Sequence, residues 1–312
     1  MTRIHRVPQS VIVAISTALV VLIHSIATGG TVHQYTETFT TTQKKDTLNT
    51  TANWDTTAGR LELYPFVLTL DGSYDTSGSA RGIFVAGDHA YVADFSAGLI
   101  VIDISDPTSP TLAGTYNTTG FANGVFVSGN HAYVADGSSG LQVIDISDPA
   151  APTLAGTYNT TGSANHVFVA GDHAYVADGV SGLQVIDISD PTTPTLAGSY
   201  DTPSTAQGVF VAGDHAYVAD GGSGLQVIDI SDPTTPTLAG TYNTPDNARG
   251  VFVSGDRAYV ADGFSGLLVI DVSDPTAPIL DGSYDTPSNA YRVFVDGDQC
   301  ICRRWPRRAA GD

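Results

Sequence analysis

Short apolar runs alternate with turn residues along most of this chain, and the alternation returns every 42 residues. The unit from Ala122 to Gly162 holds four such runs: Gly124–Ser128, His131–Asp136, Leu141–Ser147 and Thr153–Thr160. Gly, Asn, Asp and Pro separate the runs, so each reads as a short strand closed by a tight turn. The inner runs are apolar on both faces, as expected for a sheet that packs between two others. Four short strands per unit predict the blade of a β-propeller.

The number of units predicts a ring of six blades. The pentapeptide Ala-Tyr-Val-Ala-Asp occurs five times, at Ala90–Asp94, Ala132–Asp136, Ala174–Asp178, Ala216–Asp220 and Ala258–Asp262. Before these units, Gly59 to Thr76 resembles only the second half of a unit, and Ala290 to Gln299 resembles only the first half. We expect the two halves to combine into a composite blade, because closure hides edge strands that would otherwise pair with other chains. The expected fold is an all-β propeller with five complete blades and one composite blade.

The third strand of each unit carries a family resemblance. Leu99–Asp103, Leu141–Asp145 and Leu267–Asp271, with the Ser-Asp-Pro that follows them, resemble the LVIVD-repeat family, and the likeness extends from about Leu61 to Gln299. The resemblance implies a β-propeller in bacterial or archaeal surface and secreted proteins. It implies no catalytic residues.

The N-terminal residues predict export. Arg3 and Arg6 precede an apolar run from Val11 to Ala27, which is short for a membrane span and typical of a signal peptide. We therefore assign residues 1–27 to a signal peptide, with a retained anchor as the alternative, and residues 28–58 to a Thr-rich leader or linker. The propeller is assigned to residues 59–302. The expected location is secreted or on the cell surface, with no membrane insertion after cleavage.

The last residues do not fit the repeat. Cys300–Asp312 contains both cysteines and four arginines, and residues 303–312 are assigned to an aberrant tail. With suitable synonymous codons, a one-base shift turns this segment into Ala-Tyr-Val-Ala-Asp-Gly-Pro-Ala-Gly-Leu-Gln-Val-Ile, which is the missing second strand and the start of the third. We expect a frame shift near Gln299, an intended protein that continues beyond this chain, and no selected metal or disulfide role for Cys300 and Cys302. The nucleotide sequence tests this, since other codons would exclude it.

The charge of the chain limits the kinds of partner that it can bind. The net charge is −19 and comes almost wholly from Asp, most of it beside Gly, Pro or Ser at turn positions. Such a surface repels nucleic acid and anionic lipid heads, so we exclude nucleic acid as a partner. We expect a monomer.

Positions at which the copies differ indicate where a ligand would bind. The residue after the first Ala of each unit is polar, long or aromatic, and it lies at the entry to the innermost strand: Arg81, Asn123, Asn165, Gln207, Arg249, Tyr291. His166 is a further departure, where other units have Gly. Variable side chains converging on a rigid ring predict a binding site at the channel mouth, and drift at an exposed turn is the alternative. A turn position that includes Val180 and Phe264 also varies, with the same alternative.

The repeated His and Asp residues are expected to be structural. One His per blade (His89, for example) places neighbouring histidines on different sheets, which does not suit a metal site. Asp94 is expected to cap turn amides, and Asp106 precedes Pro in a turn. We expect no cofactor, with calcium at the Asp94, Asp103 and Asp106 set as the alternative, although no Asp-x-Asp-x-Asp-Gly loop occurs.

No catalytic motif is recognisable, because Ser, His and Asp recur in every blade whereas a catalytic triad needs one special constellation. The leading hypothesis is an exported, non-enzymatic binding scaffold for a protein or glycan at the cell surface. The first alternative is a lyase or hydrolase with its site at the channel mouth, for which Arg81, His166 and Arg249 are the hints. The second alternative is a purely structural spacer.

Overall fold

The computed structural model describes residues 71–286 and 288–295 with their side chains. It also describes the backbone at 296 and in strand segments 11–16, 19–22, 50–55, 60–65 and 299–304. Throughout this part of the chain the regular structure is β-strand. No helix long and apolar enough to cross a membrane occurs among the described residues.

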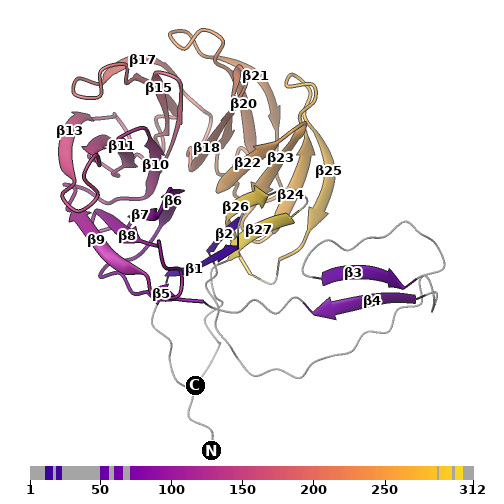
Figure 1. Cartoon of the computed structure of the whole chain (residues 1–312). Helices are drawn as coiled ribbons and strands as arrows, with labels where there is room; N and C mark the ends of the chain where they lie inside the picture. Colours follow the sequence, from indigo (N-terminus) through magenta and orange to yellow (C-terminus); the bar gives the residue numbers. More distant parts are fainter. Residues whose placement is uncertain are drawn as a thin grey trace, which may run out of the picture.

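Five four-stranded antiparallel sheets follow one another around a centre, as the blades of a propeller do (Figure 1). Blade 1 contains β6 (Gly82–Ala86), β7 (His89–Ala93), β8 (Leu99–Asp103) and β9 (Thr111–Tyr116). Blade 2 contains β10 (Gly124–Ser128), β11 (His131–Ala135), β12 (Leu141–Asp145) and β13 (Thr153–Tyr158). Blade 3 contains β14 (His166–Ala170), β15 (His173–Ala177), β16 (Leu183–Asp187) and β17 (Thr195–Tyr200). Blade 4 contains β18 (Gly208–Ala212), β19 (His215–Ala219), β20 (Leu225–Asp229) and β21 (Thr237–Tyr242). Blade 5 contains β22 (Gly250–Ser254), β23 (Arg257–Ala261), β24 (Leu267–Asp271) and β25 (Ile279–Tyr284).

Each blade repeats one register. In blade 2, Phe126 lies opposite Tyr133, Tyr133 opposite Val143, and a bulge follows Val143 where β12 pairs with β13. The turn before β12 ends at Gly140, whose φ is +70°. A Cβ there would lie 2.3 Å from the Tyr158 carbonyl oxygen, so only glycine fits this turn.

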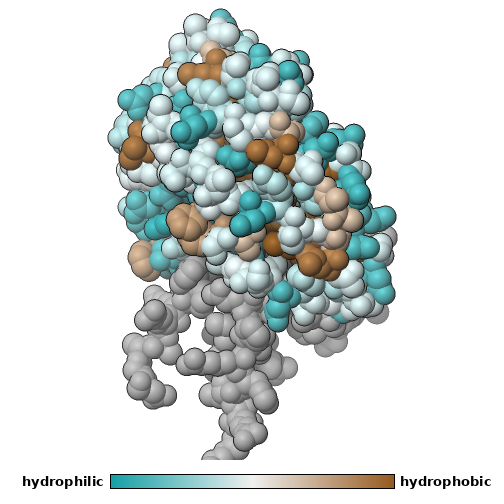
Figure 2. All heavy atoms as spheres, turned by 90° about the vertical axis from the view of Figure 1, so that its left-hand side faces the viewer, coloured by the Kyte–Doolittle hydropathy of each residue, from teal (hydrophilic) through white to brown (hydrophobic). Residues whose placement is uncertain are grey.

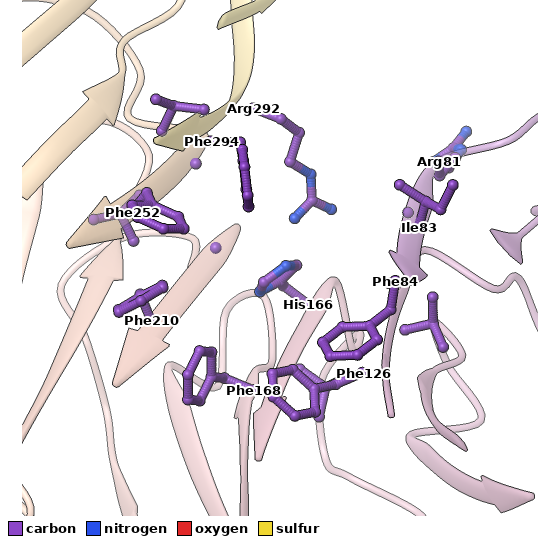
Figure 3. A pocket seen from close by; sticks show the side chains of 18 of the residues that line it. Arg81, Ile83, Phe84, Phe126, His166, Phe168, Phe210, Phe252, Arg292 and Phe294 are labelled. Atoms are coloured by element: carbon purple, nitrogen blue, oxygen red, sulfur yellow. The ribbon is translucent and has the colours of Figure 1, made fainter. Parts of the chain in front are cut away.

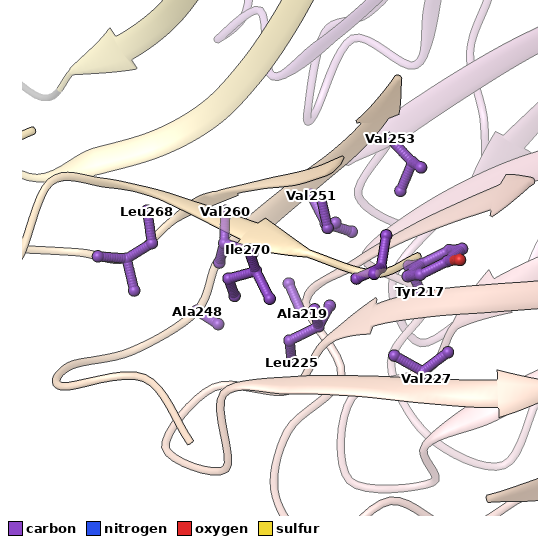
Figure 4. Close-up of a cluster of buried hydrophobic side chains, with 12 residues drawn as sticks. Tyr217, Ala219, Leu225, Val227, Ala248, Val251, Val253, Val260, Leu268 and Ile270 are labelled. Atoms are coloured by element: carbon purple, nitrogen blue, oxygen red, sulfur yellow. The ribbon is translucent and has the colours of Figure 1, made fainter. Parts of the chain in front are cut away.

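The hydrophobic core lies between the blades. Between blades 4 and 5, Tyr217, Leu225 and Val227 of one sheet pack against Val251 and Ile270 of the next (Figure 4). The same arrangement recurs between the preceding pairs of blades. The apolar character of both faces of the inner strands is thereby explained, because each inner sheet contacts a blade on either side.

Further strands lie where the chain enters and leaves the ring: β1 (Val11–Ser16), β2 (Leu19–Leu22), β3 (Thr50–Asp55), β4 (Arg60–Pro65), β5 (Ser73–Tyr74), β26 (Ala290–Asp296) and β27 (Gln299–Arg304). β26 contacts blade 5 and pairs with β27, and together they begin a sixth blade. β5 pairs with β1, and β3 pairs with β4. Direct pairing of the two half-blades therefore stays a prediction.

Several sequence-based assignments fall on parts of the chain whose side chains the structure does not describe. They are the signal peptide at 1–27, the leader at 28–58, Cys300 and Cys302, and the tail at 303–312. These assignments stay predictions.

Candidate binding site at the mouth of the central channel

One end of the ring brings two kinds of connection together. In every blade the chain enters the innermost strand at the same end at which the second strand turns into the third, because neighbouring strands are antiparallel. Isolated bridges join these connections across blades, namely Phe95–Ala122, Gly137–Ala164, Gly179–Ala206, Gly221–Ala248 and Gly263–Ala290. We call this end the mouth face. All seven sequence-predicted site residues belong to its connections or to the first two residues of the strand that follows.

The predicted mouth residues lie beside their neighbours in the next blade. Arg81 Nη1 donates to Asn123 Oδ1 at 3.1 Å, and the Asn123 amide donates to the Ala164 carbonyl at 3.1 Å. The Asn165 amide donates to the Ala206 carbonyl at 3.0 Å. These two asparagines therefore link adjacent blades, whatever else they do.

The remaining mouth residues lie on the later blades. The Arg249 guanidinium carbon lies 4.5 Å from the centre of the Tyr291 ring, which is a cation–π distance. Gln207 is partly buried, with its side-chain nitrogen near the turn at Gly221. Arg81 is the one exposed member of the predicted set, although its guanidinium lies over a ring.

Two phenylalanines that sequence reasoning missed extend this set. The Arg81 guanidinium carbon lies 3.8 Å from the centre of the Phe95 ring, and Phe95 stacks on Phe121 with ring centres 4.3 Å apart. Phe95 has a φ of +50°, and it stands where the other complete units have glycine. Phe121 stands where other units have Ser, Thr or Asn, and 51% of it is exposed. We call Arg81, Phe95 and Phe121 the mouth stack. The sequence signal that could have identified Phe95 and Phe121 is that each differs from the residue at the same position in the other units.

Behind the mouth the channel encloses a cavity of about 530 Å³ (Figure 3). His166 and Arg292 project into it from β14 and β26, and Arg81 lies at its edge. His166 and Arg292 occupy the position that is Gly82, Gly124, Gly208 and Gly250 in the other units. Sequence reasoning noted His166 but not Arg292, although the alignment of units that singled out one identifies the other.

The environment of His166 disfavours its charged form. Burial lowers the pKa of the imidazole well below its usual range, and the nearby positive charge of Arg292 lowers it further. Nδ1 lies 3.1 Å from the Val209 carbonyl oxygen, which raises the pKa but only partly offsets these effects. The ring is therefore uncharged at neutral pH.

Six phenylalanines, one per innermost strand, line the cavity: Phe84, Phe126, Phe168, Phe210, Phe252 and Phe294. Successive rings lie with centres 4.6 to 5.3 Å apart, mostly tilted by about 50°. We call them the Phe ring. Each is the middle residue of a Val-Phe-Val or equivalent triplet, so strand alternation turns it away from the valines that pack between blades. This alternation is the sequence signal for the ring.

The buried aspartates have a structural role, which confirms the prediction of turn capping. Asp136 Oδ1 accepts from the Thr118 hydroxyl at 2.6 Å, and Oδ2 accepts from the Gly120 backbone N–H at 2.7 Å. Asp94 receives equivalent bonds from Thr76 and Gly78. Burial raises the pKa of Asp136, while the two hydrogen bonds oppose the shift. Each such Asp ties the linker that enters its blade to the second strand.

The repeated histidines, and the aspartates that end the third strand or open the turn after it, lie at the opposite end. His131 faces Asp145 across β11 and β12, and Asp145 accepts from the Ser147 backbone N–H at 2.8 Å. Asp106 accepts from the backbone N–H and hydroxyl of Thr108, as expected for a turn. In the part of the chain that the structure describes, no group of three or more His, Cys, Asp or Glu residues is placed to hold a metal ion.

Solved structures with the same architecture are similar to this chain in fold. A computationally designed protein, Ika8, is 9% identical, with a TM-score of 0.58 over 72% of this chain and 67% of that one. The Cps50 (Swd1) β-propeller domain from Myceliophteria thermophila is 12% identical, with a TM-score of 0.56 over 68% and 73%. A protein of unknown function from Desulfotomaculum acetoxidans is 13% identical, with a TM-score of 0.57 over 70% and 73%. At these identities the likeness concerns the fold alone.

The family comparison is more specific. No curated protein matches the chain significantly. The LVIVD repeat model matches five consecutive segments that together make up more than half of the chain: 77–118, 119–160, 161–202, 203–244 and 245–286. Both the repeat and the blade architecture predicted from the pattern of strands and turns are thereby confirmed, and the chain belongs to the LVIVD repeat family of β-propellers.

Proposed function

We propose that this protein is an exported, non-enzymatic scaffold that binds a protein or glycan partner at the cell surface through its mouth face. The observation that carries the proposal is the mouth stack. Its three members come from different connections, each stands at a position where the units differ, and they meet on one exposed rim.

The chemistry of the mouth stack favours a protein partner over a glycan. Arginine and large aromatic side chains are enriched among the residues that dominate protein–protein binding energy. Here Arg81 is held over a ring, which fixes its direction before a partner arrives.

The backbone at Phe95 supports the same proposal. A left-handed conformation costs a non-glycine residue about 1–2 kcal/mol, and the other complete units avoid this by having glycine. Strained residues cluster at functional sites, where the surrounding structure holds them in place. Phe95 fits that description because its ring completes the stack.

The lining of the channel favours binding over acid–base catalysis. Its titratable members among the described residues are Arg81, His166 and Arg292. General acid–base hydrolysis usually needs a carboxylate or a charged-state switch near neutral pH, and His166 is held uncharged there. A lyase or hydrolase therefore remains the second candidate, with His166 as its one basic group.

Export belongs to the proposal on the strength of residues 1–27. Their basic start, apolar run and small residues at Ser25 and Ala27 match a cleavable signal. Fractionation of producing cells, with a fusion that lacks residues 1–27 as control, checks this part separately.

The binding proposal is tested with the double variant Phe95→Gly/Phe121→Ser. Both changes restore the residues that other units have, so the blades should fold. We expect purified wild-type protein to label a discrete partner by cross-linking on the surface of producing cells, and the double variant to lose at least tenfold of this labelling. Leu238→Ala, a half-exposed site on the outer strand of blade 4, is the matched control and should keep it.

Other results would redirect or overturn the proposal. Stack-dependent signal on a glycan array would identify a glycan partner instead. Unchanged labelling by the double variant would remove the mouth stack as the site. Turnover in a lyase and hydrolase screen that is lost in His166→Gly would establish the enzyme alternative. If no assay finds a partner or a turnover, the result would favour the purely structural spacer.

A further inference from the structure

The channel interior carries a second site, which shares only Arg81, at its edge, with the mouth stack and which suits a different ligand. We infer that the cavity binds a small monocarboxylate with an apolar body, its carboxylate paired with the Arg292 guanidinium near His166 and its apolar part against the Phe ring. This goes beyond the proposed function, because a small molecule inside the channel and a macromolecule on the rim can bind independently.

The size and the apolar lining of the cavity suit such a ligand. A volume of about 530 Å³ lies within the range of small-molecule sites, which are mostly apolar with a few placed polar groups. The Phe ring supplies six aromatic faces and edges around one space. Its members are partly exposed although they belong to the interior, and Phe294 is 45% exposed. An apolar ligand in the cavity would cover the aromatic surface that these rings expose to it.

The charge of the lining determines the sign of the ligand. The chain as a whole has a net charge of −19, yet the described residues that line the cavity include arginines and a histidine but no Asp or Glu. A guanidinium against a mostly apolar lining is screened less than one in open water, so an anion is favoured there over a neutral molecule. A carboxylate also matches the two parallel N–H groups of a guanidinium.

The positions of Arg292 and His166 place the head of the ligand. They project from the innermost strands of blade 3 and of the beginning sixth blade, which lie opposite each other in a ring of six such strands. Figure 3 shows the two side chains pointing toward one another across the cavity. Arg292 Nη2 also lies 3.5 Å from the Asn123 carbonyl oxygen, which directs the guanidinium inward. The Val209 carbonyl oxygen, 3.1 Å from Nδ1, likewise fixes the orientation of the imidazole ring.

Comparison of the units shows that His166 and Arg292 are exceptions at their position in the repeat. At the same position the other four units have glycine, and a Cβ at Gly82 or Gly250 would lie about 3 Å from the backbone of the next strand. A side chain at this position is therefore the exception, and the two that occur, His166 and Arg292, both point into the cavity (Figure 3). Packing alone does not require either of them, because four units pack against their neighbours without one.

The test uses the full chain and three probes in isothermal titration calorimetry. 4-Phenylbutyrate has both the carboxylate and an apolar body, 4-phenyl-1-butanol lacks the charge, and acetate lacks the body. We expect saturable binding of 4-phenylbutyrate at one site, at least tenfold tighter than binding of either other probe. No saturable binding of 4-phenylbutyrate, or equal binding of the alcohol or of acetate, would overturn the inference without any variant.

Two arginine variants then locate the site. Arg292→Met keeps an unbranched apolar stem and removes the charge, and we expect it to weaken 4-phenylbutyrate binding at least tenfold while leaving the alcohol unchanged. Arg257→Met is the matched control, since Arg257 lies outside the cavity and pairs with Asp281 at 2.7 Å. Equal binding by Arg292→Met and wild type overturns the assignment. The mouth-stack double variant should bind 4-phenylbutyrate normally, so the two proposals fail separately.

Discussion

Asp178 shows at the scale of one residue how the repeat stabilises itself. Its side chain is fully buried at the end of the second strand, where it accepts from the Thr160 hydroxyl and, at 2.7 Å, from the Gly162 backbone N–H. Capping by this aspartate was predictable from sequence because its two partners lie only 18 and 16 residues before it, in the linker that enters its blade. The mouth stack was not predicted, because its rings meet only after two blades have packed together.

Asp178→Asn should destabilise the fold by about 1–3 kcal/mol, the usual effect of leaving a buried donor unsatisfied. The Asn carbonyl can still accept from Thr160, but its NH₂ group would face the Gly162 N–H, donor against donor. Urea unfolding followed by circular dichroism measures the difference. Asp201→Asn, at an exposed position in the following linker, is the control and should change stability little. Equal stability of Asp178→Asn and wild type would contradict the capping role.

The same carboxyl predicts a pH dependence. Burial raises the pKa of Asp178 in the folded state above its unfolded value of about 3.9. As the pH falls from neutral through the folded-state pKa, the folded protein takes up this proton before the unfolded chain does. The contribution of Asp178 to the free energy of unfolding therefore increases as the pH falls. The stability advantage of wild type over Asp178→Asn should therefore grow between about pH 7 and pH 4.

Asp187 provides the opposite case for comparison. Hydrogen bonds from Ser189 lower its pKa, so its contribution is present at neutral pH and lost only as the pH falls below about 4. Asp187→Asn should thus show a constant difference from wild type over the range in which Asp178→Asn changes. A parallel course for the two variants would refute the assignment of the raised pKa to Asp178.

At the scale of the element, the predicted and observed strands agree closely. The run predicted at Gly124–Ser128 is β10, and the others begin where expected but end one or two residues earlier. The early ends have a local cause. Asp145 accepts from the Ser147 N–H and so closes β12, and Asp136 leaves β11 to cap its linker.

The element-scale prediction concerns the packing between blades. Ile186 on β16 is fully buried among Val143 and Ala135 of the preceding blade, so Ile186→Ala should destabilise the protein by about 2–5 kcal/mol. Leu196→Ala on the outer strand of the same blade is the matched control, because its side chain is 45% exposed and an effect within about 0.5 kcal/mol is expected. Thermal and urea unfolding give both values. Similar losses for the two variants would show that the inter-blade core is not the main source of stability.

At the scale of the whole molecule, the exposed apolar residues are spread around the ring. A leucine recurs on the outer strand of each of the five blades at about half exposure: Leu112, Leu154, Leu196, Leu238 and Leu280. Figure 2 shows the apolar side chains on one side of the ring mostly as separate spots among polar ones. Apolar residues scattered in this way do not form the contiguous patch that a stable interface needs.

We therefore expect a monomer in solution. The mass by light scattering after size exclusion should be close to that of one chain, 32.4 kDa before any processing. It should stay so at high salt, where repulsion from the net charge of −19 is screened. A dimer that persists on dilution at either salt concentration would contradict this and would point to an interface outside the described surface.

The sequence by itself determined the blade, its turns, its caps and its number of complete copies, because each depends on contacts between residues close to one another in the chain and the unit is written out five times. It also marked Arg81 and His166 as exceptions. Only the tertiary structure decided what the exceptions do. Ring geometry brings Arg292 opposite His166, gathers six phenylalanines around one cavity and stacks Phe95 on Phe121. These contacts join different blades, so no single unit contains the information that specifies them.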